Sequence, residues 1–169
     1  MKKTMVVVLM SLVLVALGIA PVMADDGANV STVAAGATIG NVNTAAGFTS
    51  GPRSTVDGFI TAVAGVTIGT EAKVNGNVTA GAGFASGAKS KVKGSVSAKA
   101  GFTSGANSTI SGDVSVGADF TSGANSVISG NVTAIGSITL GAGSKVLGSI
   151  HSGTGIIVYG RGASVGSVN

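Results

Sequence analysis

Residues 94–130 have the sequence GSVSAKAGFTSGANSTISGDVSVGADFTSGANSVISG, and this stretch decides the fold. Gly94, Gly112 and Gly130 are 18 residues apart, and a valine follows two residues after each of them. A repeat of fixed period predicts a solenoid, in which each repeat forms one coil that stacks on the previous one. The same pair recurs along the chain. The glycines are Gly40, Gly58, Gly76, Gly94, Gly112, Gly130, Gly148 and Gly166, and the β-branched residues are Val42, Ile60, Val78, Val96, Val114, Val132, Ile150 and Val168.

Within a repeat, apolar or small residues occupy the second, fourth, eighth, tenth, fourteenth and sixteenth positions when the coils start at Asn29, Gly47, Gly65 and so on. Pairs of residues two apart match a strand that alternates its faces, and the pairs recur every six residues. The pattern predicts three short strands per coil. The second position, predicted to face inward, holds Val30, Phe48, Val66, Phe84, Phe102, Phe120, Ile138 and Ile156.

The sequence therefore predicts an all-β fold over residues 29–169, a single-stranded β-solenoid of eight 18-residue coils. A flattened two-sheet β-arch of the same period is the alternative. The predicted core ladders are Phe48, Phe84, Phe102 and Phe120 with Val78, Val96, Val114 and Val132. The eight repeating glycines are predicted to lie at coil corners, where the backbone needs either a positive φ or a close approach to another coil.

Composition excludes several functional classes. The 169 residues include 29 glycines and one histidine but no cysteine, so neither a disulfide framework nor a thiolate or histidine-rich metal site is expected. The acidic residues Asp57, Glu71, Asp113 and Asp119 lie in four different coils and form no pair for hydrolysis and no calcium ladder. We expect no enzyme activity, no cofactor and no small-molecule substrate, and His151 stands alone in an outward column.

The N-terminus has the pattern of a cleavable signal peptide over residues 1–24. Lys2 and Lys3 precede an uncharged apolar run, and small residues end at Ala24 before Asp25. Residues 25–28 form a short segment before the first coil. Without Lys2 and Lys3, eight basic residues face six acidic ones, a net charge of +2, so nucleic-acid binding is not expected. The signal predicts export, to the extracellular space or the cell envelope.

Residues 136–150, GSITLGAGSKVLGSI, resemble the repeats of the bactofilins, a family of polymer-forming β-solenoid proteins. The resemblance covers residues 29–169 and implies end-to-end polymerisation without nucleotide. Bactofilins are mostly cytoplasmic or membrane-associated, whereas the export signal favours a role outside the cell. In its overall character, exported, cysteine-free and rich in Gly, Ala, Ser and Thr, the chain also resembles the sheath subunit of filament-forming methanogenic archaea.

Solenoid ends expose unpaired backbone groups, and no capping segment is evident in residues 25–28 or after the truncated last coil at Asn169. We therefore expect a homopolymer with amyloid-like cross-β character, assembled into a sheath, fibre or envelope layer. The alternative is a monomeric ice-binding or surface-adhesion solenoid that uses outward threonine ladders. One ladder is Thr49, Thr67, Thr103, Thr121 and Thr139, and the other is Thr61, Thr79, Ser97, Ser115 and Thr133.

Two sets of surface residues are further candidates. Lys89, Lys91, Lys93 and Lys99, joined by Lys73, form a basic patch that could contact a cell surface, most directly through Lys89, Lys91 and Lys93, although solvated lysines that prevent aggregation explain it equally well. Asn-x-Ser/Thr triplets, which can accept glycans on an exported protein, start at Asn29, Asn77, Asn107 and Asn131.

Overall fold

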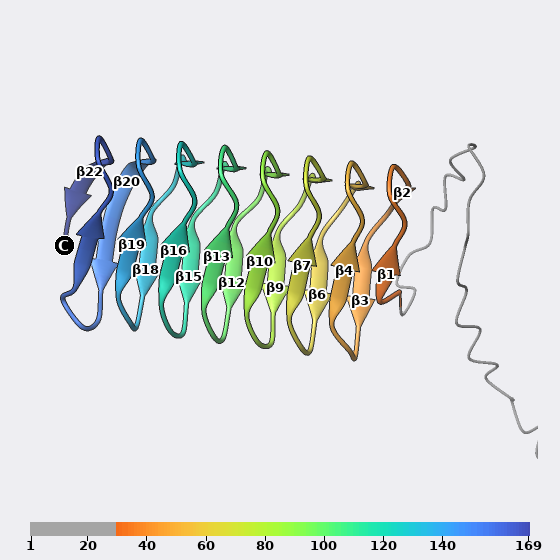
Figure 1. Ribbon diagram of the computed structural model, residues 1–169. Coiled ribbons are helices and arrows are strands. Elements are labelled where there is room, and N and C mark those ends of the chain that lie inside the picture. The colour runs from red at the N-terminus through yellow and green to blue at the C-terminus, as the bar shows by residue number, and fades with distance from the viewer. Residues whose placement is uncertain (1–29) are drawn as a thin grey trace, which may run out of the picture.

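A computed structural model describes residues 30–169. The predicted signal peptide with its cleavage point between Ala24 and Asp25, the segment 25–28 and the candidate acceptor Asn29 lie outside the described residues. Over the described range every regular element is a strand, and the strands stack as the coils of a rod (Figure 1). The β-solenoid of about eight turns predicted from the 18-residue repeat is confirmed.

Each coil contributes one strand to each of three parallel ladders, so the three-sided section is the observed one. The first ladder contains β1 (Thr32–Val33), β4 (Phe48–Ser50), β7 (Val66–Ile68), β10 (Phe84–Ser86), β13 (Phe102–Ser104), β16 (Phe120–Ser122), β19 (Ile138–Leu140) and β21 (Ile157–Tyr159). The second contains β2 (Thr38–Ile39), β5 (Thr55–Val56), β8 (Lys73–Val74), β11 (Lys91–Val92), β14 (Thr109–Ile110) and β17 (Val127–Ile128). The third contains β3 (Val42–Thr44), β6 (Ile60–Ala62), β9 (Val78–Ala80), β12 (Val96–Ala98), β15 (Val114–Val116) and β18 (Val132–Ala134).

The second and third ladders join near the C-terminal end of the rod. There a single long strand, β20 (Lys145–Ser152), pairs with both β17 and β18 and continues across the corner between the two ladders. The last strand, β22 (Ser164–Val168), pairs with β20. The corner that separates two strands in the first six coils is therefore spanned by one continuous strand in each of the last two.

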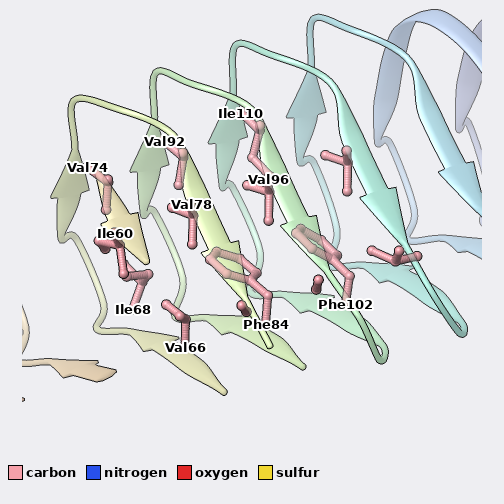
Figure 2. Close-up of a cluster of buried hydrophobic side chains, with 14 of the residues drawn as sticks. Ile60, Val66, Ile68, Val74, Val78, Phe84, Val92, Val96, Phe102 and Ile110 are labelled. Atoms are coloured by element: carbon pink, nitrogen blue, oxygen red, sulfur yellow. The ribbon is translucent and has the colours of Figure 1, made fainter. Parts of the chain in front are cut away.

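The core consists of columns of stacked apolar side chains because the interior coils pair in an 18-residue register. Phe84 pairs with Phe102 and Phe102 with Phe120, which stacks their rings with centroids 5.0 and 4.7 Å apart. Figure 2 shows the valine and isoleucine columns that run beside these rings. All eight residues of the predicted core ladders are at most 2% exposed. Burial of each such side chain stabilises the fold by about 1.5–3 kcal/mol, and the column repeats this gain in every coil.

One corner of the core is polar. Ser54, Ser90, Ser108, Ser126 and Ser144 occupy the eighth position and are at most 2% exposed. Four of these hydroxyls donate to glycine carbonyls of their own coil or of the preceding one, and that of Ser90 donates to Ser108 Oγ at 3.3 Å. Ser108 Oγ lies 2.7 Å from the oxygen of Gly105 and 3.1 Å from that of Gly87. No buried side-chain nitrogen or oxygen within residues 30–169 lacks a partner. The serines therefore fill a narrow corner without an unsatisfied polar group.

The repeating corner glycines are explained by close backbone approach and not by positive φ. A Cβ on Gly76 would lie 2.6 Å from the carbonyl carbon of Gly58, and on Gly94 it would lie 2.5 Å from that of Gly76. Gly69, Gly105 and Gly141 of the second glycine column meet the preceding coil at similar distances. Any side chain in these columns would push neighbouring coils apart, so glycine is required by the spacing of about 4.8 Å between paired strands.

Positive φ falls instead on a column that the sequence pattern did not reveal. One residue per coil adopts the left-handed conformation at the turn between the first and second ladders, and the eight residues are Gly36, Arg53, Glu71, Lys89, Asn107, Asn125, Gly143 and Gly162. In the second coil the N–H of Ser54 donates to the carbonyl of Gly51 across Pro52 and Arg53, as in a type II turn. Because five different residue types fill this column, no glycine signal marks it.

The first and last coils depart from the predicted 18-residue spacing. Thr32 pairs with Thr49, 17 residues on, because the corner between β2 and β3 is one residue shorter than in the next coil. Ile138 pairs with Ile157, 19 residues on, so the prediction that Ile156 faces inward is wrong. Ile156 is 56% exposed and Ile157 packs against the core. The corner accommodates the extra residue because Gly155 adopts φ +72° where no atom lies within 4 Å of its Cβ position.

Val30, predicted to face inward, is half-buried and packs against the core, as Val33 and Ile39 of the same coil do. The carbonyl of Ser31 accepts the N–H of Thr49. The described residues include no helix of the length and hydropathy needed to cross a membrane.

Candidate interaction surfaces

As far as residues 30–169 show, both ends of the rod carry strands that are paired on one side only. Within the described residues β1, β2 and β3 each pair only toward the second coil, and β21 and β22 pair only toward the coil before them. Figure 1 places these two sets of strands at opposite ends of the rod. Each end therefore presents backbone N–H and C=O groups that a further parallel strand could pair with.

The C-terminal end is also apolar. Ile156, Val158, Tyr159 and Val168 are between 45% and 56% exposed, and Leu147 in the preceding coil is 61% exposed. Val158 pairs with Thr139, so the threonine ladder ends in an apolar side chain at this coil. Burying these residues against another surface would remove them from water. The sequence pattern did not predict that Ile156 and Val168 are exposed, because the repeat aligned both with buried columns.

The predicted threonine ladder of the first sheet lies in register on an outward face. Thr49 pairs with Thr67, Ala85 with Thr103, and Thr121 with Thr139. The second set lies on the third ladder, where Thr61 pairs with Thr79 and Ser97 with Ser115. The two sets belong to different sides of the rod.

The predicted lysine patch divides into separate places. Lys73 and Lys91 pair in register on β8 and β11, and together with Lys93 they line an open groove on the second ladder. Lys89 lies at the left-handed turn, where its Nζ is 3.7 Å from Glu71 Oε1. Lys99 follows β12 of the third ladder and is not part of the groove.

Outward Asn, Asp and Ser side chains bind the backbone of the next coil. Asn77 Oδ1 accepts the N–H of Ser95 at 2.9 Å, and Asn131 Oδ1 accepts that of Ser149 at 2.8 Å. Asp119 accepts both the N–H of Ser137 at 2.7 Å and its hydroxyl at 2.9 Å. These hydrogen bonds, the backbone one first, lower the pKa of Asp119.

The remaining candidates are isolated. His151 is exposed on β20, pairs in register with Thr133, and has Nδ1 2.9 Å from the oxygen of Asn169. No group of three or more His, Asp or Glu side chains that could hold a metal ion occurs in residues 30–169. The candidate glycan acceptors Asn77, Asn107 and Asn131 are all exposed, and Asn107 lies at a left-handed turn.

The surfaces of the described residues are built from columns that repeat along the rod. Comparisons with protein-family models, with curated proteins and with solved structures found no match for this chain.

Proposed function

We propose that this chain is an exported, non-enzymatic structural protein that assembles end to end into an extracellular sheath, fibre or envelope layer. The observation that carries the proposal is the pair of open ends: β1, β2 and β3 at one end and β21 and β22 at the other are each paired on one side only within residues 30–169. The strands at both ends run in the parallel sense of the interior ladders.

Stacking of one subunit on the next continues all three ladders. The contact joins two different surfaces, so it is heterologous and propagates into a filament or a large ring. At about 4.8 Å per coil each subunit adds roughly 38 Å to the axis. The product is a polymer with strands perpendicular to its axis, which gives it amyloid-like cross-β character.

The apolar C-terminal coil favours this contact. Val168 pairs with Ile150 and continues a core column that is fully buried one coil earlier. A first coil placed over it would cover Val168 and its exposed neighbours while pairing the open backbone groups. The bactofilin-like repeat of residues 136–150 and the signal-peptide pattern of residues 1–24 support a polymer outside the cytoplasm.

Electron microscopy and fibre diffraction of the purified protein at native salt test the proposal. We expect filaments, rings or tubes and an axial reflection near ~4.8 Å. A stable monomer at high concentration, seen as isolated short rods, would refute end-to-end assembly.

A second candidate is a monomeric ice- or surface-binding solenoid, favoured by the in-register outward threonines of the first ladder. A flat face of regularly spaced hydroxyls offers a repeating array to a solid surface. An ice-recrystallisation assay on short rods distinguishes the two functions. Substitution of Thr103 and Thr121 by lysine should abolish inhibition if the ladder binds ice and should leave assembly unchanged if stacking is the function.

A further inference from the structure

Three lysines crowd one shallow groove in the middle of the rod. Lys73 and Lys91 lie directly opposite each other on β8 and β11, and Lys93 lies two residues further along the chain. Neighbouring strands are about 4.8 Å apart, which is the backbone separation of Lys73 and Lys91. Alternate residues of a strand are about 6.6 Å apart, which is the separation of Lys91 and Lys93. The Cα atoms of the three lysines therefore form a small triangle. Like charges on directly opposed strand positions destabilise a sheet.

None of these three lysines forms an ion pair with a carboxylate of residues 30–169. The one ion pair among the described residues joins Lys89 to Glu71 at the turn outside the groove. Asp57, in the coil before Lys73, accepts a 2.7 Å hydrogen bond from the Asn75 amide and forms no ion pair with a lysine of the groove. By these spacings Lys91 lies closer to each of the other two lysines than the Debye length of about 8 Å at physiological salt, so the field of the three charges is only partly screened and attracts anions.

We propose that this groove, the lysine groove, binds a linear acidic polysaccharide. Hydroxyl groups border the lysines, with Thr55 at one end of the groove and Thr109 and Ser111 at the other. A polysaccharide presents hydroxyls and spaced carboxylates together, which matches a strip of ammonium groups flanked by hydroxyls. Side chains that can both donate and accept hydrogen bonds suit a sugar ring.

Other polyanions fit the groove less well. No aromatic side chain lines it, so it offers no platform on which nucleic-acid bases could stack. None of the large exposed apolar side chains lines it either, so it lacks the insertion that strengthens contact with a lipid bilayer. The lysine groove lies within one subunit, in the third and fourth coils and their neighbours, and therefore does not depend on the proposed assembly.

Binding to polygalacturonate, with neutral dextran as a reference, tests the inference. The purified protein should bind polygalacturonate in a salt-sensitive manner, and it should bind oligothymidylate and phosphatidylserine vesicles more weakly. The triple variant K73Q/K91Q/K93Q should bind polygalacturonate at least tenfold more weakly. The matched control K89Q/K99Q/K145Q removes the same charge outside the groove and should stay within threefold of the unmodified protein.

Circular dichroism and thermal melting of both variants confirm that they fold, and the groove variant should melt no lower than the unmodified protein because it loses a repulsion. Equal losses of binding in the two variants would mean that net charge alone is responsible and would overturn the proposal. Absence of binding to polygalacturonate, or tighter binding to the vesicles or the oligonucleotide, would overturn it as well. None of these results depends on whether filaments form.

Discussion

Phe102 lies between the rings of Phe84 and Phe120 and is 1% exposed. Truncation of Phe102 to alanine leaves a cavity between the two remaining rings, and the paired backbones on either side prevent the coils from closing it. We therefore expect F102A to lower the free energy of unfolding by about 3–5 kcal/mol. The neighbouring residue Thr103 faces outward and provides the control, because T103A should change the free energy of unfolding by less than about 0.5 kcal/mol. Urea unfolding monitored by circular dichroism measures both. Equal effects of the two substitutions would contradict the ladder as the source of stability.

The ionisation of Asp119 should make the free energy of unfolding depend on pH in the acid range. Its carboxylate accepts the N–H and hydroxyl of Ser137, which holds its pKa below the ordinary value. A lowered pKa in the folded state contributes stability above the unfolded pKa, and that contribution is lost as the pH falls through the folded pKa. D119N keeps an acceptor, as Asn131 does toward Ser149, but cannot titrate.

The difference in unfolding free energy between the unmodified protein and D119N should therefore change in acid and be constant near neutrality. Urea titrations at several pH values measure it, and the carboxyl resonance of Asp119 gives the pKa directly. A difference that stays constant down to about pH 2 would contradict the role of these hydrogen bonds.

At the scale of the element, the turn between the first and second ladders predicts opposite effects for two neighbouring substitutions. Gly51 would place a Cβ 2.5 Å from the nitrogen of Ala35, so G51A should destabilise the coil by about 2 kcal/mol or more. Arg53 has φ 58°, a conformation that costs a non-glycine residue about 1–2 kcal/mol. R53G should therefore stabilise by about 0.5–1 kcal/mol after the entropic cost of glycine. Thermal melting of the pair measures both, and the same sign for the two substitutions would show that the turn is assigned incorrectly.

The strands could be predicted from sequence because burial selects apolar residues at alternate positions, and this selection repeats in every coil. Val96, Val114 and Val132 carry that signal without ambiguity. The turns could not be predicted to the same degree. The left-handed column holds Arg53, Glu71 and Lys89, so a backbone constraint is present without the residue type that usually marks it. A one-residue insertion at a corner left Ile156 and Ile157 indistinguishable by spacing, and only pairing decides which one faces inward.

For the whole molecule, surfaces were harder to predict than the core because residues close in sequence can face different sides of the rod. Lys89, Lys91 and Lys99 appear as one cluster in the chain, yet the structure assigns them to a turn, the second ladder and the end of the third. Lys73 joins Lys91 through the 18-residue register. A period predicts which residues stack, whereas the orientation of a short charged segment depends on where each corner lies.

The last coil also allows assembly to be separated from folding. Val168 continues the column of Ile150 and is 54% exposed. The side chain of the adjacent Ser167, on the same strand, points to the opposite face. V168K would place an ammonium group in the core column where the last coil of one subunit meets the first coil of the next. Burying this charge without a partner costs too much free energy for the contact to form. We expect V168K to abolish filaments seen by electron microscopy while leaving the circular dichroism spectrum of the subunit unchanged. S167K adds the same charge on the outer side and should still polymerise, because its side chain stays in water. Filaments of V168K as long as those of S167K would show that subunits do not join by extending the core columns through this coil.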